Sequence, residues 1–255
     1  MKGIRSVFQI ISRYEQIPLL LALIVICIFL ATQSDVFLTL GNIMNVLRQS
    51  SIVLIAALGM TVALLAGQVD LSIGSLLAVV SVGTVFTYNF TGSVLLAALT
   101  AVFIGLIVGL INGLLVTRAH INALIATLGM MAVLRGIGYL TTNARAVQTD
   151  GDTLKLIGTG YIGPTPVPVI IAAVVLVLIY YLLNHTTFGR YVYATGGNEE
   201  AAKSSGIPVV RIQLLVFIIV AVTAAISGLI ATGRINSFQP TLGMMFELEV
   251  IAAVI

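Results

Sequence analysis

The stretch LLAGQVDLSIGSLLAVV, residues 64–80, places a single carboxyl group, that of Asp70, between two apolar runs. No charged residue lies between Arg48 and Asp70, and none follows until Arg118. A charged side chain at the centre of a membrane helix costs roughly 2.5 kcal/mol or more. Asp70 therefore needs either a place at the end of a helix or a partner inside the protein.

The composition of the whole chain is that of a membrane protein. Of 255 residues, 59% are hydrophobic and 8% are charged, whereas a soluble domain carries about 25% charged residues. The mean hydropathy is +1.15. The uncharged runs have the length of helices and lack the strict alternation of a membrane barrel. The sequence therefore predicts an all-α, polytopic transmembrane helical bundle that forms one domain over residues 1–255.

The apolar runs predict seven complete spans and the start of another. Asn42 is the expected N-cap of the second span. The first run lacks the A-x-A pattern of a cleavage site and is read as an uncleaved helix. The last run, VIAAVI, ends without a polar tail, so we expect the natural chain to continue beyond residue 255. The seven complete spans are expected at 17–33, 43–67, 71–88, 94–117, 122–140, 167–183 and 209–232.

Basic residues orient these spans, because loops on the cytoplasmic side carry more Lys and Arg. A cytoplasmic N-terminus gives six basic residues inside and three outside. The segment 142–166 is then an extracytoplasmic loop, and the segment 184–207 is a cytoplasmic loop. The inside set is Lys2, Arg5, Arg13, Arg118, Arg190 and Lys203; the outside set is Arg145, Lys155 and Arg234.

Several kinds of chemistry are missing from the sequence. None of the three lysines belongs to a G-x-x-x-x-G-K-[ST] phosphate loop. His120 and His185 lie in separate short loops without a metal-ligand spacing. We therefore expect no catalytic residues, no metal, no cofactor and no nucleic-acid partner, which leaves transport or a scaffolding role.

The segment GRYVYATGGNEEAAKSSGIP, residues 189–208, predicts a short helix with clear end signals. Gly196 and Gly197 are expected to break the backbone before it, and Asn198 is a favourable N-cap. Glu199 lies in the first turn, and Gly206 is placed to end the helix. On these residues alone, the helix is either a solvated connection or a docking helix for a cytoplasmic partner.

Three motifs carry a resemblance to a known family. GQVDLSIGSLLA, NALIATLGMMAVLRG and FGRYVYATGGNEEAAKSSGI, in this order, resemble the permease subunits of ribose-type ATP-binding-cassette (ABC) sugar importers, and the tail GMMFELEVIAAVI fits the same family. The resemblance implies a permease for a pentose or hexose in the bacterial inner membrane. It implies three partners: a second permease chain, identical or different, a separate cytoplasmic ATPase and an extracytoplasmic sugar-binding protein. The ATPase-coupling residues that it implies are Gly196, Gly197, Asn198, Glu199, Ala201, Ser205 and Gly206.

Polar residues inside the predicted spans are candidates for the translocation path or its gate. Asp70 either caps the helix that starts at Leu71, pairs with Arg135 or Arg48, or faces the path. Each of the others is also explained by helix packing or capping. The candidates are Asp70, Ser72, Asn112, Asn122, Thr127 and Arg135.

Other interpretations remain open on the sequence. An ion-coupled secondary transporter would need more intramembrane carboxylates or an inverted repeat, and no repeat is apparent. A membrane scaffold would not need a short helix with such clear start and stop signals after Asn198. A permease of the same family for a sugar-like signal molecule is a further alternative. Gly105, Gly109 and Gly113 share one helix face, which predicts tight packing in the bundle, or otherwise a pore or dimer stripe.

Overall fold

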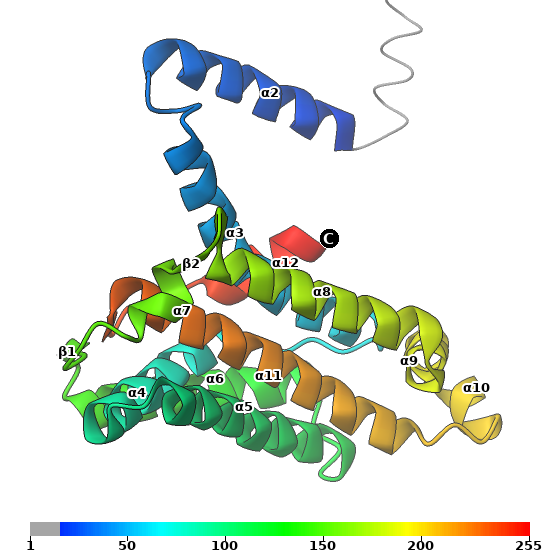
Figure 1. Ribbon diagram of the computed structural model, residues 1–255. Helices are drawn as coiled ribbons and strands as arrows, with labels where there is room; N and C mark the ends of the chain where they lie inside the picture. Colours follow the sequence, from blue (N-terminus) through cyan, green and yellow to red (C-terminus); the bar gives the residue numbers. More distant parts are fainter. Residues whose placement is uncertain (1–15) are drawn as a thin grey trace, which may run out of the picture. The chain divides into compact units, whose positions relative to one another are not determined.

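The computed structural model describes residues 16–255, and its regular structure is almost entirely helical (Figure 1). Contacts divide the chain into one unit that ends at Leu47 and a second unit, Arg48–Ile255. Helix α2 (Gln16–Gln33) belongs to the first unit, and α3 (Leu40–Leu65) continues into the second. The predicted cytoplasmic residues Lys2, Arg5 and Arg13 lie outside the described residues.

Within residues 16–255, six helices are long and apolar enough to cross a membrane. The first predicted span, 17–33, corresponds to α2, whose apolar stretch Ile17–Gln33 is shorter than these six. The prediction of an all-α, polytopic bundle is confirmed. The six helices are α3, α4 (Ile73–Thr91), α5 (Val94–Thr117), α6 (Ala123–Thr142), α8 (Val167–His185) and α11 (Val209–Ile235).

The predicted N-cap at Asn42 is wrong, because α3 begins two residues earlier, at Leu40. The hydroxyl of Thr39 accepts the backbone N–H of Asn42 at 3.4 Å. The side chain of Asn42 instead donates to the carbonyl of Phe37 at 2.8 Å. Thr39 therefore supplies the capping oxygen, which leaves Asn42 inside the first turn.

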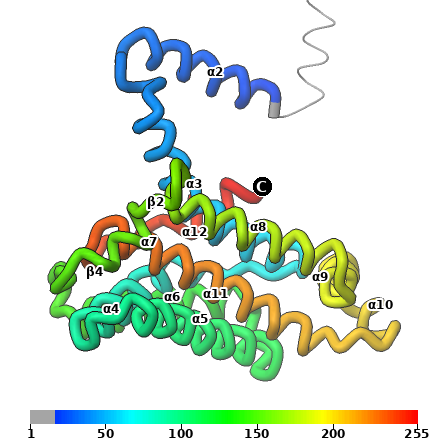
Figure 2. The backbone as a smooth tube through the Cα atoms, in the orientation of Figure 1, coloured from blue at the N-terminus to red at the C-terminus, as the bar shows by residue number. Residues whose placement is uncertain are grey.

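Helix α11 lies at the centre of the second unit and packs against α5 and α4 (Figure 2). The three glycines of α5 make this packing close. A Cβ atom at Gly105 would lie 2.7 Å from that of Ala225, and one at Gly109 would lie 2.7 Å from the Ile218 Cα atom. One at Gly113 would lie 2.6 Å from Leu214 Cδ1. The prediction of tight packing inside the bundle is confirmed.

The segment 142–166 is more ordered than a polar loop. Strand β1 (Val147–Gln148) pairs antiparallel with β4 (Ser237–Phe238), and β2 (Tyr161–Ile162) pairs with β3 (Thr165–Pro166). The short helix α7 (Lys155–Thr159) lies against α11. This segment therefore covers one end of the bundle as a small folded layer.

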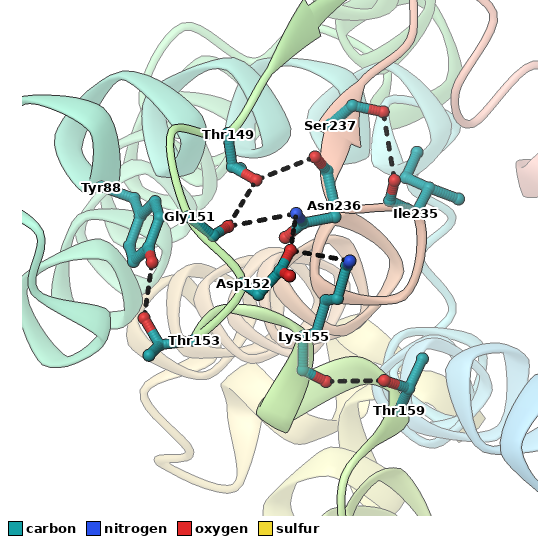
Figure 3. A network of polar contacts seen from close by, with 10 residues as sticks. All are labelled: Tyr88, Thr149, Gly151, Asp152, Thr153, Lys155, Thr159, Ile235, Asn236 and Ser237. Carbon is teal, nitrogen blue, oxygen red and sulfur yellow. Dashed lines mark hydrogen bonds and ion pairs between the residues drawn. The ribbon is translucent and has the colours of Figure 1, made fainter.

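Hydrogen bonds hold this layer to the spans (Figure 3). The amide of Asn236 donates to the Gly151 carbonyl at 3.1 Å and to Asp152 at 3.2 Å. The hydroxyls of Tyr88 and Thr153 lie 2.5 Å apart. These bonds join the ends of α4 and α11 to residues 149–153, far away in the sequence.

The segment 184–207 contains two helices, α9 (Thr187–Gly197) and α10 (Glu199–Ser204). The predicted break at Gly196 and Gly197 is wrong, because α9 runs through both glycines. The two helices are separated by Asn198, which has an extended backbone and ends α9 while capping α10. The final described helix, α12 (Phe246–Val254), begins four residues before the last apolar run, VIAAVI.

Candidate functional site

The α3–α4 connection, residues 66–72, is an irregular segment within the bundle. Figure 1 shows it as a thin trace that returns from the end of α3 to the start of α4. Gly67 has a φ of 72°, which suits glycine. Asp70 and Ser72 are both 0% exposed. Non-helical backbone at membrane depth is tolerated where protein buries it or where it lines a water-filled cavity. Asp70 and Ser72 are buried, whereas Gly67, Gln68 and Val69 line a cavity.

Asp70 is held by three donors. Its Oδ1 atom accepts the backbone N–H of Ser72 at 2.8 Å and the Ser72 hydroxyl at 2.6 Å. Its Oδ2 atom accepts from the Asn112 amide of α5 at 3.1 Å. The same amide also donates to the Ser72 hydroxyl at 3.0 Å. The structure thus brings three of the six predicted residues into one buried network.

The network lies a short way inside the bundle from one end of α5. Asn112 precedes the last residue of that helix, Thr117, by five positions. At 1.5 Å per residue, this is a depth of about 7.5 Å. The prediction that Asp70 caps a helix starting at Leu71 is wrong, because α4 begins at Ile73 and its N-cap is Ser72, whose side chain makes no capping bond. Asp70 lies two residues before this N-cap, accepts the Ser72 N–H and hydroxyl, and ties the start of α4 to α5 through Asn112.

The arginines considered as partners of Asp70 bind elsewhere. The guanidinium of Arg135 donates to the Leu242 carbonyl at 2.8 Å. That of Arg48 donates to the Tyr161 hydroxyl at 2.7 Å and lies over the same ring. Within residues 16–255, the ion pairs are Lys155–Asp152 and Lys203–Glu199. Asp70 therefore relies on neutral hydrogen-bond donors.

The remaining path candidates, Asn122 and Thr127, have local partners on α6. Asn122 caps the helix, since its side chain accepts the Leu124 N–H at 2.9 Å. Thr127 is buried and donates to the Ala123 carbonyl at 2.8 Å. Neither joins the Asp70 network.

A cavity of about 530 Å³ opens beside this network. The α3–α4 connection, the α5–α6 turn, α10 and α11 all contribute to its wall. Polar groups from all four line it, and the α6 cap lies at its edge. These polar lining residues are Gln68, Thr117, His120, Asn122, Glu199, Lys203 and Gln213.

Helix α10 has the end signals expected from its sequence. The Asn198 side chain accepts the Ala201 N–H at 2.9 Å, and Gly206 follows the helix with a φ of 80°. Ser205 donates its hydroxyl to the Ala201 carbonyl at 2.9 Å. Every residue of α10 except Ala202 is exposed, so this short helix presents an ordered polar face.

Glu199 fixes α10 to the membrane helices. Lys203 donates to its Oε1 atom at 2.5 Å, and Gln213 of α11 donates to its Oε2 atom at 3.1 Å. The hydrogen bond from Lys203 lowers the pKa of Glu199 below its ordinary value. Glu199 is therefore charged at neutral pH and can accept both bonds.

The sequence reasoning missed two features of the site. Gln213 is only 6% exposed and was hidden within an apolar run, where its polar side chain was the available signal. Gly74 lies where the Gly243 carbonyl and the Glu247 side chain approach α4, and a Cβ atom there would collide with both. Within residues 16–255, Glu247 Oε2 is buried and has no hydrogen-bond partner.

Comparison with known proteins identifies the class. A bundle of membrane spans with a buried polar break and an ordered polar connection is typical of a multi-pass transport protein. The profile of a family described as "Branched-chain amino acid transport system / permease component" matches residues 42–255. The chain belongs to this family of permease components.

Individual relatives show which permeases of this family the chain resembles. The "Ribose import permease protein RbsC" of Haemophilus influenzae is 38% identical over 259 residues, which cover 100% of this chain and 80% of the relative. The "L-arabinose transport system permease protein AraH" of Escherichia coli is 32% identical over 96% of this chain and 74% of its own length. No solved structure matches the chain. The resemblance to ribose-type ABC permeases is confirmed.

Proposed function

We propose that the chain is the membrane subunit of an ATP-driven importer for a monosaccharide of the pentose or hexose class. The observation that carries the proposal is the similarity, over nearly the whole chain, to permeases named for ribose and L-arabinose. ATP is bound and hydrolysed by a separate subunit. An extracytoplasmic binding protein delivers the sugar, and a second permease chain completes the pathway.

In this proposal, the segment 184–207 couples transport to the ATPase. Helix α10 is capped, polar and exposed on much of its surface, as a docking element requires. The coupling residues are those named from the sequence, Gly196 to Gly206. Two facts favour the placement: α10 adjoins the cavity of about 530 Å³, and Glu199 links it to α11.

The two ends of the bundle fit a cytoplasmic N-terminus. Arg118 and Lys203 lie at the end that holds α10 and the cavity. Lys155 and Arg234 lie at the opposite end, where α7 packs on α11. The first end is cytoplasmic in the proposal, and the segment 142–166 covers the extracytoplasmic end, where the binding protein delivers sugar.

The proposed path runs past the break at Asp70. The Asp70, Ser72 and Asn112 network positions the start of α4 next to the cavity. Asn122 lines the cytoplasmic exit, and Arg135 holds residues 239–245 through Leu242. Thr127 lies between them on α6. The network shapes the path, and the carboxyl group of Asp70 itself stays bound to protein.

Affinity purification of the tagged chain from membranes in mild detergent tests the proposal. An ATPase with a phosphate-binding loop should co-purify in a fixed ratio to the chain. Such a subunit is not required by an ion-coupled transporter or by a scaffold. Recovery of the chain in a folded state, repeatedly without an ATPase, would contradict the proposed function.

A further inference from the structure

Two adjacent glycines at the end of α9 differ sharply in their surroundings. A Cβ atom on Gly196 would collide with the Leu65 carbonyl oxygen at the end of α3 and lie 2.8 Å from the carbonyl carbon. A Cβ atom on Gly197 would meet nothing within 4 Å. The backbone of α9 therefore rests directly on the backbone of α3 at Gly196, with no side chain between them.

A second contact joins the same region to α11. The buried amide of Gln213 donates to Glu199 in the first turn of α10 at 3.1 Å. Since α9 and α10 meet at Asn198, both contacts lie within four residues of one another in the sequence. The α9–α10 corner is thus supported by α3 on one side and by α11 on the other.

The α3 contact leads to the buried network. The chain turns after Leu65, where the N–H of Gln68 binds the Ala63 carbonyl at 2.9 Å. Asp70 follows two residues later and is tied to Asn112 of α5. A displacement of the end of α3 therefore acts on the connection that positions the start of α4.

We propose that Gly196 and Gln213 are positioning residues that transmit movement of α10 to the α3–α4 connection and to α11. The proposal rests on the proposed function, in which α10 docks on the ATPase. A contact between two backbones transmits a push without the slack of flexible side chains, because packed interiors deform little. Gly196 is thus required for its small size at this contact.

The variant Gly196→Ala tests the first contact. The added methyl group must separate α9 from α3, while the exposed face of α10 keeps its residues. In the purified complex with its ATPase, we expect ATP hydrolysis to persist and sugar uptake per ATP hydrolysed to fall about tenfold, within the usual range of coupling between sites. Gly136→Ala on α6, where the new Cβ atom meets nothing within 4 Å, is the comparison and should keep the ratio of uptake to hydrolysis.

The variant Gln213→Met tests the second contact without added bulk, so it is informative even where Gly196→Ala fails to assemble. It should lower the same ratio at normal levels of complex. Gly129→Ala, at an open position on α6, is the control for the substitution itself and should behave like the unsubstituted protein.

Unchanged ratios in Gly196→Ala and Gln213→Met, or equal losses in Gly136→Ala, would overturn the inference. A structural defect alone would lower hydrolysis and uptake together with the amount of complex, and it would leave their ratio unchanged. Failure of the unsubstituted complex to hydrolyse ATP or to transport sugar would instead contradict the proposed function.

Discussion

At the scale of single residues, Asp70 shows how a polar group is kept within an apolar bundle. Three donors bind its carboxyl group, and the Ser72 N–H is one that a helix start would otherwise leave unpaired. Removing one member of a buried hydrogen-bonded set leaves its partners unsatisfied, at a cost of about 1–3 kcal/mol per group. The same side chain thus holds the turn before α4 and links it to α5.

Two substitutions of Asp70, both of similar size to Asp, test whether its hydrogen bonds are what the protein needs. Asp70→Asn should be mild, because an Asn side chain can accept the backbone N–H two residues ahead as Asp does. The Asn112 Oδ1 atom, which has no partner within residues 16–255, can rotate to accept the new amide. Asp70→Leu should destabilise the chain by about 3 kcal/mol, since it removes the acceptor of the Ser72 N–H, of the Ser72 hydroxyl and of one Asn112 bond. Assembled complex and sugar uptake are measured for both variants.

The two readouts distinguish a structural role from contact with the sugar. If Asp70 acts mainly through the network, Asp70→Asn assembles and transports nearly normally, while Asp70→Leu assembles poorly. Normal assembly of Asp70→Asn with lost uptake or altered sugar preference would contradict the structural account and place the carboxyl group on the sugar's route.

At the scale of elements, the contact between α5 and α11 depends on the absence of side chains. At Gly109, a Cβ atom would lie 2.7 Å from the Phe217 carbonyl oxygen and the Ile218 Cα atom. Both are backbone atoms, so no rotamer change relieves the overlap. Close approach of two membrane helices through small residues is a common source of their association, because lipid offers no hydrophobic drive between helices.

Gly109→Ala should therefore destabilise the bundle by about 1–3 kcal/mol through overpacking. Gly136→Ala, on α6 with nothing within 4 Å of the new Cβ atom, is the matched control and should have little effect. The difference in stability is measured by heating both variants in detergent and recording the loss of monodisperse protein with temperature. Equal melting temperatures for the two variants would show that the α5–α11 contact yields easily.

The sequence predicts these elements well where their causes are local. The bounds of α5 follow from an uncharged run between Ser93 and Arg118, and Asn122 and Asn198 cap helices as their residue types favour. The path of α9 through Gly196 was not predictable, since it depends on Leu65, which is distant in sequence. The layer over residues 142–166 was missed for the same reason, because Asn236 holds it.

In the candidate site too, contacts between residues close in sequence could be predicted, and contacts between distant residues could not. Ser72 is close to Asp70 in sequence, so their bond was within reach of local reasoning. The third member, Asn112, was identified only as a polar residue in a span, since nothing local indicates which helix it faces. Arg48 binds a tyrosine hydroxyl and Arg135 binds a backbone carbonyl. The sequence suggested the carboxylate of Asp70 for both, because reasoning from charge alone pairs an arginine with an acidic residue.

At the scale of the whole molecule, the basic residues and the fold together predict the orientation. In a background without Cys27, a cysteine at Ala146 should react with a membrane-impermeant thiol reagent added to intact cells. A cysteine at Ala119, in the α5–α6 turn, should react only after the cells are opened. Both alanines are exposed, so accessibility within the protein is matched. The reverse labelling pattern would overturn the cytoplasmic placement of α10.

The source of energy is the central claim, and uptake into sealed vesicles tests it most directly. Vesicles containing the purified complex, with the binding protein and a radiolabelled pentose or hexose on the extracytoplasmic side, are supplied with ATP on the other. The account predicts sugar accumulation that requires ATP hydrolysis and persists when a protonophore and ionophores remove every ion gradient. Accumulation that proceeds without ATP and stops when the ion gradients collapse would contradict it.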